Sequence, residues 1–173
     1  MAGKLRLVPY DDAWPARFAE EAARVRAALG RRALAIEHVG STAVPGLAGK
    51  PVLDLAIAVR GEAEADACIA PLEAIGYAYR SVHGGDPRRR YYVRDDGSRR
   101  VAQIHLYILP APAWNEKLAF RDALRADPAL ARAYEAAKWR VAEEVGWDKR
   151  AYAEAKDPFV ERVLAELRAG GRF

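Results

Sequence analysis

The sequence predicts an α/β (α+β) fold in which a strand-rich part is followed by a helical part. Two apolar runs, ALAIEHV and PVLDLAIAV, have the length and composition of buried strands, and a later β-rich stretch contains a turn dipeptide. From about Asn115 onward, apolar residues recur at helical spacing instead. No repeat, low-complexity tract or flexible linker separates the two parts, so we expect residues 1–173 to form one domain.

Glycines and prolines divide the strand-rich part into short elements, because these residues end helices and mark loops. The expected elements are, in order, a helix that follows Asp11 and Asp12 and ends at Gly30, a strand at residues 33–39, a loop at 40–50, a strand at 51–59, a helix at 62–74 and a short strand at 77–80.

The segment RRRYYVRDDGSRRVAQIHLYIL predicts a β-hairpin. Its dipeptide Asp96-Gly97 is a strong signal for a two-residue turn, in which both central positions need positive φ. A turn centred there sets a register in which Arg90 faces Gln103 and Arg88 faces His105. One face of the hairpin would then be polar and the other would belong to the core.

Three helices are expected in the C-terminal part. LAFRDALRADP is expected to form a short helix that stops near Asp127-Pro128. The apolar stripe that follows predicts a second helix that ends at Gly146, and Asp157-Pro158 begins the last helix.

The composition is that of an ordinary globular protein, with 51% hydrophobic residues in 173. The net charge of +4 is a mild excess of 28 basic over 24 acidic residues, which does not by itself require a nucleic-acid partner. Cys68 is the single cysteine and excludes an internal disulfide. Because no segment resembles a signal peptide or a membrane span, we expect a cytoplasmic protein.

The stretch VGSTAVPGLAGKPVLDLAI joins a loop suited to phosphate to a strand with one acid. A small pair such as Gly40-Ser41 lets backbone N–H groups approach a phosphate. Asp54 lies in the next strand, where a carboxylate can hold a metal beside phosphoryl oxygens. A metal-holding strand usually has a second acid two residues later, yet this position is Ala56. The layout is that of a nucleotidyl-transfer site with an incomplete acid set.

Two histidines are candidates for the same site. Alternation places Asp54 and His105 on one face, and we expect His38, Asp54 and His105 to form a site for Mg²⁺, Mn²⁺ or Zn²⁺. In the alternative interpretation, His38 anchors the loop through hydrogen bonds.

Basic and hydroxyl side chains supply the expected contacts to phosphate. Arginine is concentrated around the hairpin, either as an anion-facing patch or as solvated surface. The residues expected to bind phosphate or nucleotide are Gly40, Ser41, Thr42, Lys50, Arg88 and Arg90.

Four stretches in order between Trp14 and Leu164 resemble the GrpB family: EHVGSTAVPGLAGKPVLDL, QIHLYI, FRDALRADPALARAYEAAKWRVA and YAEAKDPFVERVL. The resemblance implies a branch of the nucleotidyltransferase superfamily with the DNA polymerase beta type of fold, a mixed sheet flanked by helices. It also marks Arg121, Lys138 and Lys156 as family motif residues, although helix packing and ion pairs would explain them as well.

Part of the superfamily's active-site pattern is present. Gly40, Ser41 and Asp54 match it. Ala56 departs from it, and His105 stands at a place equivalent to that of a further acid.

These observations are compatible with two functions. In the first, the protein transfers a nucleotidyl group from a nucleoside triphosphate to a small acceptor, with Asp54 and His105 as catalytic residues. In the second, it is a non-catalytic module that binds a phosphorylated metabolite or a metal at a degenerate site. A third, plainer alternative is a scaffold with a vestigial pocket. The expected partner is a phosphorylated small molecule, and neither a polynucleotide nor a membrane; no particular oligomeric state is predicted.

Overall fold

A five-stranded mixed sheet forms the centre of the protein. The computed structural model describes residues 4–82, 86–155 and 157–173. The strand order is β1-β2-β5-β4-β3, in which β2 and β5 are parallel and all other neighbours are antiparallel. The strands are β1 Ala35–Val39, β2 Leu53–Val59, β3 Ala78–Val82, β4 Arg89–Asp96 and β5 Arg99–Ile108. The predicted mixed sheet flanked by helices is therefore confirmed.

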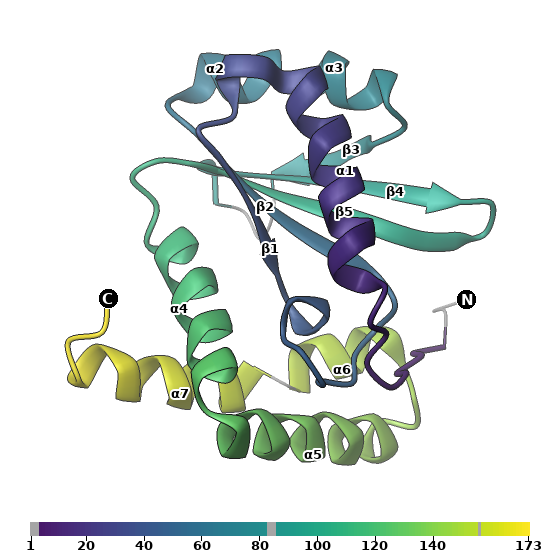
Figure 1. Cartoon of the computed structure of the whole chain (residues 1–173), viewed down its shortest axis with the longest axis vertical. Coiled ribbons are helices and arrows are strands. Elements are labelled where there is room, and N and C mark those ends of the chain that lie inside the picture. Colours follow the sequence, from purple (N-terminus) through teal and green to yellow (C-terminus); the bar gives the residue numbers. More distant parts are fainter. Residues whose placement is uncertain (1–3, 83–85, 156) are drawn as a thin grey trace.

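Helices from the first and second halves of the chain lie on opposite sides of the sheet (Figure 1). On one side lie α1 Trp14–Leu29, α2 Glu62–Ala67 and α3 Ile69–Ala74; on the other side lie α4 Pro112–Ala126, α5 Pro128–Glu144, α6 Lys149–Ala155 and α7 Asp157–Ala169. Two short 3₁₀ helices, η1 Gly30–Arg32 and η2 Ser41–Ala43, occupy connections.

The helical predictions are mostly correct, with two differences. The single helix expected at 62–74 is interrupted at Cys68. Pro71 explains the break, because it has no N–H to donate to the carbonyl of Ala67 and its ring would clash with that carbonyl. The short helix α6 was not predicted at all.

The main core lies between the sheet and α1–α3. Leu55, Ile57 and Val59 of β2 are fully buried there, as are Ile104 and Leu106 of β5. Each such side chain contributes about 1.5–3 kcal/mol when removed from water. The alternation expected for β2 is thus confirmed, and the other face of this strand remains for Asp54.

The hairpin register differs from the predicted one. The turn residues are Gly97 and Ser98, of which only the glycine has a positive φ, +58°. This fits a turn with glycine at its first central position. A further irregularity follows between Arg94 and Asp95. Together the two features shift the pairing, so the predicted alignment of the hairpin is wrong.

Arg88 and Arg90 are placed elsewhere as a result. Arg90 pairs with Leu106 and lies on the core face, where it donates to the carbonyl of Pro87 at 2.5 Å. Arg88 precedes β4 and donates to the carbonyl of Pro110 at 2.9 Å. Neither residue faces Asp54. The partner of Arg90 is three residues from the predicted Gln103, and a shift by an odd number of residues exchanges the faces of a strand.

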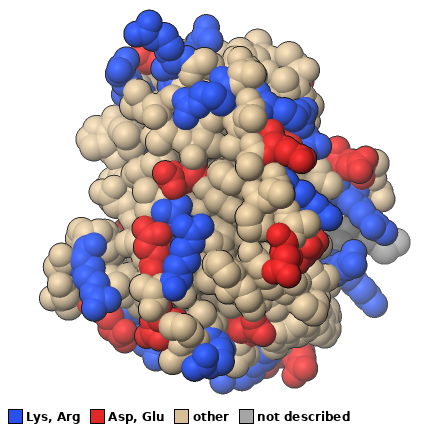
Figure 2. Space-filling view, viewed as in Figure 1, with Lys and Arg blue, Asp and Glu red and all other residues tan. Residues whose placement is uncertain are grey.

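The outer surface carries charges of both signs. Figure 2 shows basic and acidic side chains interspersed over most of the visible face. In the described part of the chain, no helix has the combination of length and apolar character needed to cross a bilayer.

Candidate functional site

A cavity of about 860 Å³ lies between the second face of the sheet and the C-terminal helices. The volume is in the range of small-molecule sites. Seven of its lining residues are basic and three are acidic. The basic residues are Lys50, Arg89, Arg100, Lys117, Arg121, Lys138 and Lys149, and the acidic ones are Asp54, Glu116 and Glu161.

Asp54 lies in the sheet wall of this cavity, held by its neighbours on β5. Gln103 is its pairing partner and donates from Nε2 to Oδ1, while Nε2 of His105 lies 3.4 Å from the same oxygen. Tyr91 donates its hydroxyl to Oε1 of Gln103 at 2.6 Å, which fixes the orientation of the amide. Asp54 and His105 do share a face, as predicted.

Burial opposes the ionisation of Asp54, but its neighbours reverse this effect. Burial would raise the pKa of the Asp54 carboxyl, whereas the hydrogen bond and charge of His105, the charge of Lys117 and the hydrogen bond of Gln103 lower the pKa overall. The group is therefore a carboxylate at neutral pH.

Gly40 brings the loop into direct contact with that carboxylate. Its φ is +74°, a left-handed conformation that favours glycine. A Cβ at this position would lie 2.5 Å from Oδ2 of Asp54. The loop thus reaches the acid only because position 40 has no side chain.

Charged side chains of α4 and α5 hold the loop in place from the other side of the cavity. They bind backbone groups along its whole length. Arg121 donates to the carbonyl of His38 at 3.0 Å, Arg125 to that of Ala43 at 2.8 Å and Lys138 to that of Ala48, and Glu135 accepts from the N–H of Ala48 at 2.7 Å.

Lys138 also contacts the hydroxyl of the Gly-Ser pair. The lysine is 3% exposed, and its Nζ donates to Oγ of Ser41 at 2.9 Å. Because Oγ accepts this bond, the hydroxyl proton of Ser41 is directed elsewhere and can be donated.

Five of the predicted site residues line the cavity: Gly40, Ser41, Lys50, Asp54 and His105. Thr42 does not. It is 1% exposed and its hydroxyl is paired with Nε2 of His38 at 2.9 Å.

His38 lies on the opposite face of the sheet from Asp54. It pairs with Leu55 and stacks on Phe18, with ring centroids 4.3 Å apart. The expectation that His38, Asp54 and His105 converge on a metal is therefore wrong. Among the residues that the structure describes, no group of three histidine, cysteine or acidic side chains is arranged to hold a metal ion. The alternative interpretation, a histidine that anchors the loop, agrees with the contact to Thr42.

Several cavity residues were missed in the sequence. Arg89 and Tyr91, rather than Arg88 and Arg90, face the cavity from the hairpin. The correct register would have identified them. Tyr107 follows His105 by two residues, so the same strand alternation would have placed it; Lys117 and Lys149 have no comparable local signal. Lys156, a family motif residue, lies outside the described residues.

Replacing Gly40 with alanine tests the contact between loop and carboxylate. Gly46 provides a matched control, since its φ is +78° but a Cβ there would meet nothing within 4 Å. We expect Gly46→Ala to cost about 1–2 kcal/mol from backbone strain. Gly40→Ala should cost about 1–3 kcal/mol more because of the clash. Urea denaturation measures both values, and equal losses would contradict the close approach.

His38 predicts a pH dependence of stability. Burial, together with nearby arginines, lowers the pKa of His38 from 6.5 to about 4. The unfolded chain therefore binds more protons than the folded one between these values, and stability falls as the pH decreases through this window. The loss approaches about 3 kcal/mol. In His38→Gln the slope of unfolding free energy between pH 6.5 and 4 should be smaller. The same slope in both proteins would refute the assignment.

Comparisons with known proteins agree with this architecture. Residues 4–166 match the family described as GrpB protein. A UPF0157 protein of Pseudomonas aeruginosa is 36% identical over 172 residues, which cover 98% of this chain and 70% of that protein. The crystal structure of the conserved protein GrpB from Enterococcus faecalis is similar with a TM-score of 0.84 and 32% identity, over 93% of this chain and 96% of the other.

A more distant likeness concerns the fold alone. A structure of the Cid1 poly(U) polymerase superimposes with a TM-score of 0.54 and 16% identity, over 78% of this chain and 45% of that chain. The mixed sheet and its helices are thus those of a nucleotidyltransferase-like fold. Given the family match over nearly its whole length and relatives above 30% identity, the chain belongs to the GrpB family.

Proposed function

We propose that the protein binds a nucleotide or another phosphorylated small molecule in the cavity between the Gly40-Ser41 loop, β2 and helices α4–α7. The observation that carries this proposal is the excess of basic side chains in a cavity of about 860 Å³. Such a cavity concentrates positive potential, since low-dielectric walls focus the field of the charges that line it.

The loop provides contacts suited to a phosphate. Gly40 allows close approach, and the hydroxyl of Ser41 has its acceptor side occupied by Lys138 at 2.9 Å. Ser41 is therefore a donor toward the cavity, backed by a buried cation. A hydrogen bond from a charged or polarised donor to a phosphate oxygen is stronger than one between neutral groups.

The acid content of the site favours binding over two-metal chemistry. Two-metal sites need carboxylates that are shared between the ions. Ala56 is fully buried where a second acid would lie on β2, and His105 occupies the adjacent position on β5. Oδ1 of Asp54 is already an acceptor for Gln103. The described residues therefore do not fit a two-metal centre.

Transfer of a nucleotidyl group to a small acceptor is a second candidate. One observation favours it: Asp54 keeps an ionised carboxylate in contact with the Gly40-Ser41 loop. In this candidate Asp54 and His105 are the reacting residues, together with a divalent ion such as Mg²⁺ or Mn²⁺.

Isothermal titration with ATP and the other nucleoside triphosphates tests binding. Lys138→Met should weaken binding by about 10- to 100-fold, because it removes the charged hydrogen bond that leaves the Ser41 hydroxyl free to donate toward the cavity. Arg140→Met is the matched control, because its side chain is on the same helix but 70% exposed. Thermal unfolding shows whether each variant remains folded. No binding by the wild type at millimolar nucleotide would exclude the nucleotide, and no binding of a simple alkyl phosphate either would refute the proposal.

Pyrophosphate release separates the two candidates. If the protein only binds nucleotide, pyrophosphate release should not exceed that of buffer with Mg²⁺, Mn²⁺ or EDTA. The Asp54→Asn variant should then still bind nucleotide. Release by the wild type that is abolished both by EDTA and by Asp54→Asn would instead support transfer.

A further inference from the structure

Two buried donors in the cavity wall have no hydrogen-bond partner among the described residues. They are the hydroxyl of Tyr107 and Nε of Arg89. Tyr107 is 0% exposed, and both residues line the cavity. An unsatisfied buried polar group costs about 1–3 kcal/mol, and folded proteins contain few of them. Two such donors in one wall therefore indicate a group that the chain itself does not supply.

The two residues lie side by side. Arg89 and Tyr107 are direct pairing partners across β4 and β5. The guanidinium carbon lies over the aromatic ring, 5.2 Å from its centroid. Burial raises the pKa of Tyr107 to about 12 although Arg89 opposes the shift, and the phenol is thus a neutral donor at pH 7.

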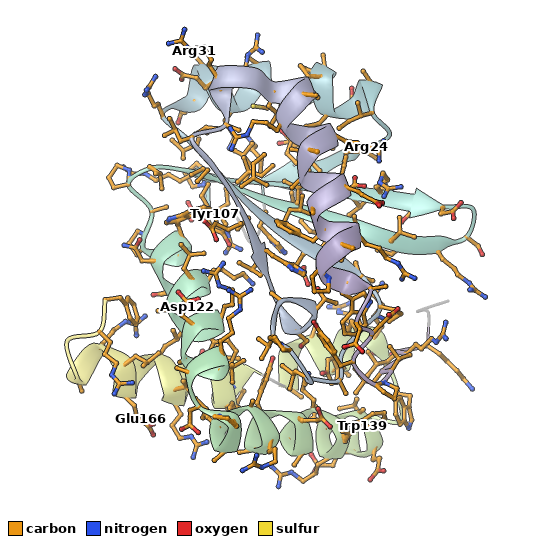
Figure 3. The ribbon with its side chains drawn as sticks, in the orientation of Figure 1. Arg24, Arg31, Tyr107, Asp122, Trp139 and Glu166 are labelled. Carbon is orange, nitrogen blue, oxygen red and sulfur yellow. The ribbon has the colours of Figure 1, made fainter. Side chains whose placement is uncertain are left out.

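The surrounding charge selects an anion. Helix α4 begins at Pro112 with no side-chain cap and no acidic residue in its first turn, and Ala113 of this turn lines the cavity. Figure 3 shows Tyr107 beside this end of α4. A helix N-terminus carries partial positive charge. The nearest acid of the helix, Glu116, is already paired with Arg168.

This group of donors is separate from the Gly40-Ser41 end of the same cavity. Gln103 lies opposite Asp54, and Tyr107 is four residues further along β5. At 3.3–3.4 Å per residue the two ends are about 13 Å apart. His105 and Tyr91 occupy the wall between them.

We propose that Arg89, Tyr107 and the first turn of α4 form a second anion subsite, and that the ligand of the cavity carries two anionic groups. One is the phosphate at the Gly40-Ser41 loop, and the other is a phosphate or carboxylate at Arg89 and Tyr107. This inference rests on the proposed function and names its ligand class: a doubly anionic small molecule long enough to span both ends.

The test compares three synthetic probes by isothermal titration on the full chain. They are hexane-1,6-diyl bisphosphate, 6-hydroxyhexyl phosphate and the analogue of the latter that ends in a carboxylate. The bisphosphate should bind the wild type at least about tenfold more tightly than the monophosphate, the value of one charge-assisted hydrogen bond. The third probe identifies whether a carboxylate gives the same gain.

Two substitutions should remove this gain. They are Tyr107→Phe, which deletes only the hydroxyl, and Arg89→Met. Tyr92→Phe is the matched control: its hydroxyl is also buried without a partner, but Tyr92 lies in the core on the other face of the sheet. Neither tyrosine variant should lose thermal stability, because neither hydroxyl has a partner to lose.

The outcomes separate the two proposals. Binding of the monophosphate with no gain from a second anion would overturn the subsite and leave the proposed function intact. A gain that persists in both Tyr107→Phe and Arg89→Met, or a marked loss of stability in Tyr107→Phe alone, would also overturn the subsite. If the wild type binds no probe and no nucleotide, both proposals fail.

Discussion

The parallel pairing of β2 with β5 is the constraint on which the rest of the structure depends. It aligns Leu55 and Ile57 with Ile104 and Leu106 against α1–α3, and by alternation it leaves the opposite face to polar groups. Parallel neighbours need a crossover connection, so the chain must pass through α2, α3 and the hairpin before it returns beside β2. The polar face of β2 and β5 therefore combines two segments that are distant in the sequence. The helices that follow β5 form the other walls of the cavity.

Local patterns predict the part of the site that lies on single strands and tight loops. Gly40, Asp54 and His105 were placed correctly because strand alternation is a period of two and a glycine marks a close approach. The predicted hairpin register is wrong for two reasons. The turn lies one residue later than expected, which shifts the pairing by two residues, and the irregularity between Arg94 and Asp95 adds a third, which exchanges the faces; no local pattern fixes either feature. His38 failed for a related reason: its neighbour Val39, not His38, is the partner of Asp54 in β1. Lys138 contacts Ser41, 97 residues earlier in the sequence. This contact depends on how the helices pack, which no local pattern shows.

The basic residues described here have two structural functions that composition does not distinguish: some bind the loop backbone, and another pairs with a buried acid. Arg121, Arg125 and Lys138 bind loop carbonyls and act as structural supports. Arg94, within the arginine-rich hairpin, is paired with buried Glu21 and fastens β4 to α1. The arginine-rich hairpin is therefore neither one anion-facing patch nor simply solvated surface. Each basic residue acquires its function from the face of the strand or helix on which it lies.

The close approach of Gly40 to Asp54 also links the side chains that the two positions can tolerate. A side chain at position 40 would occupy the space of Oδ2, 2.5 Å from the added Cβ, so it demands a smaller residue at position 54. A relative that loses this glycine is expected to have lost the acid as well, whereas loss of the acid first leaves the glycine without its steric constraint. A side chain at position 40 thus requires a change at position 54, whereas a change at position 54 requires none at position 40.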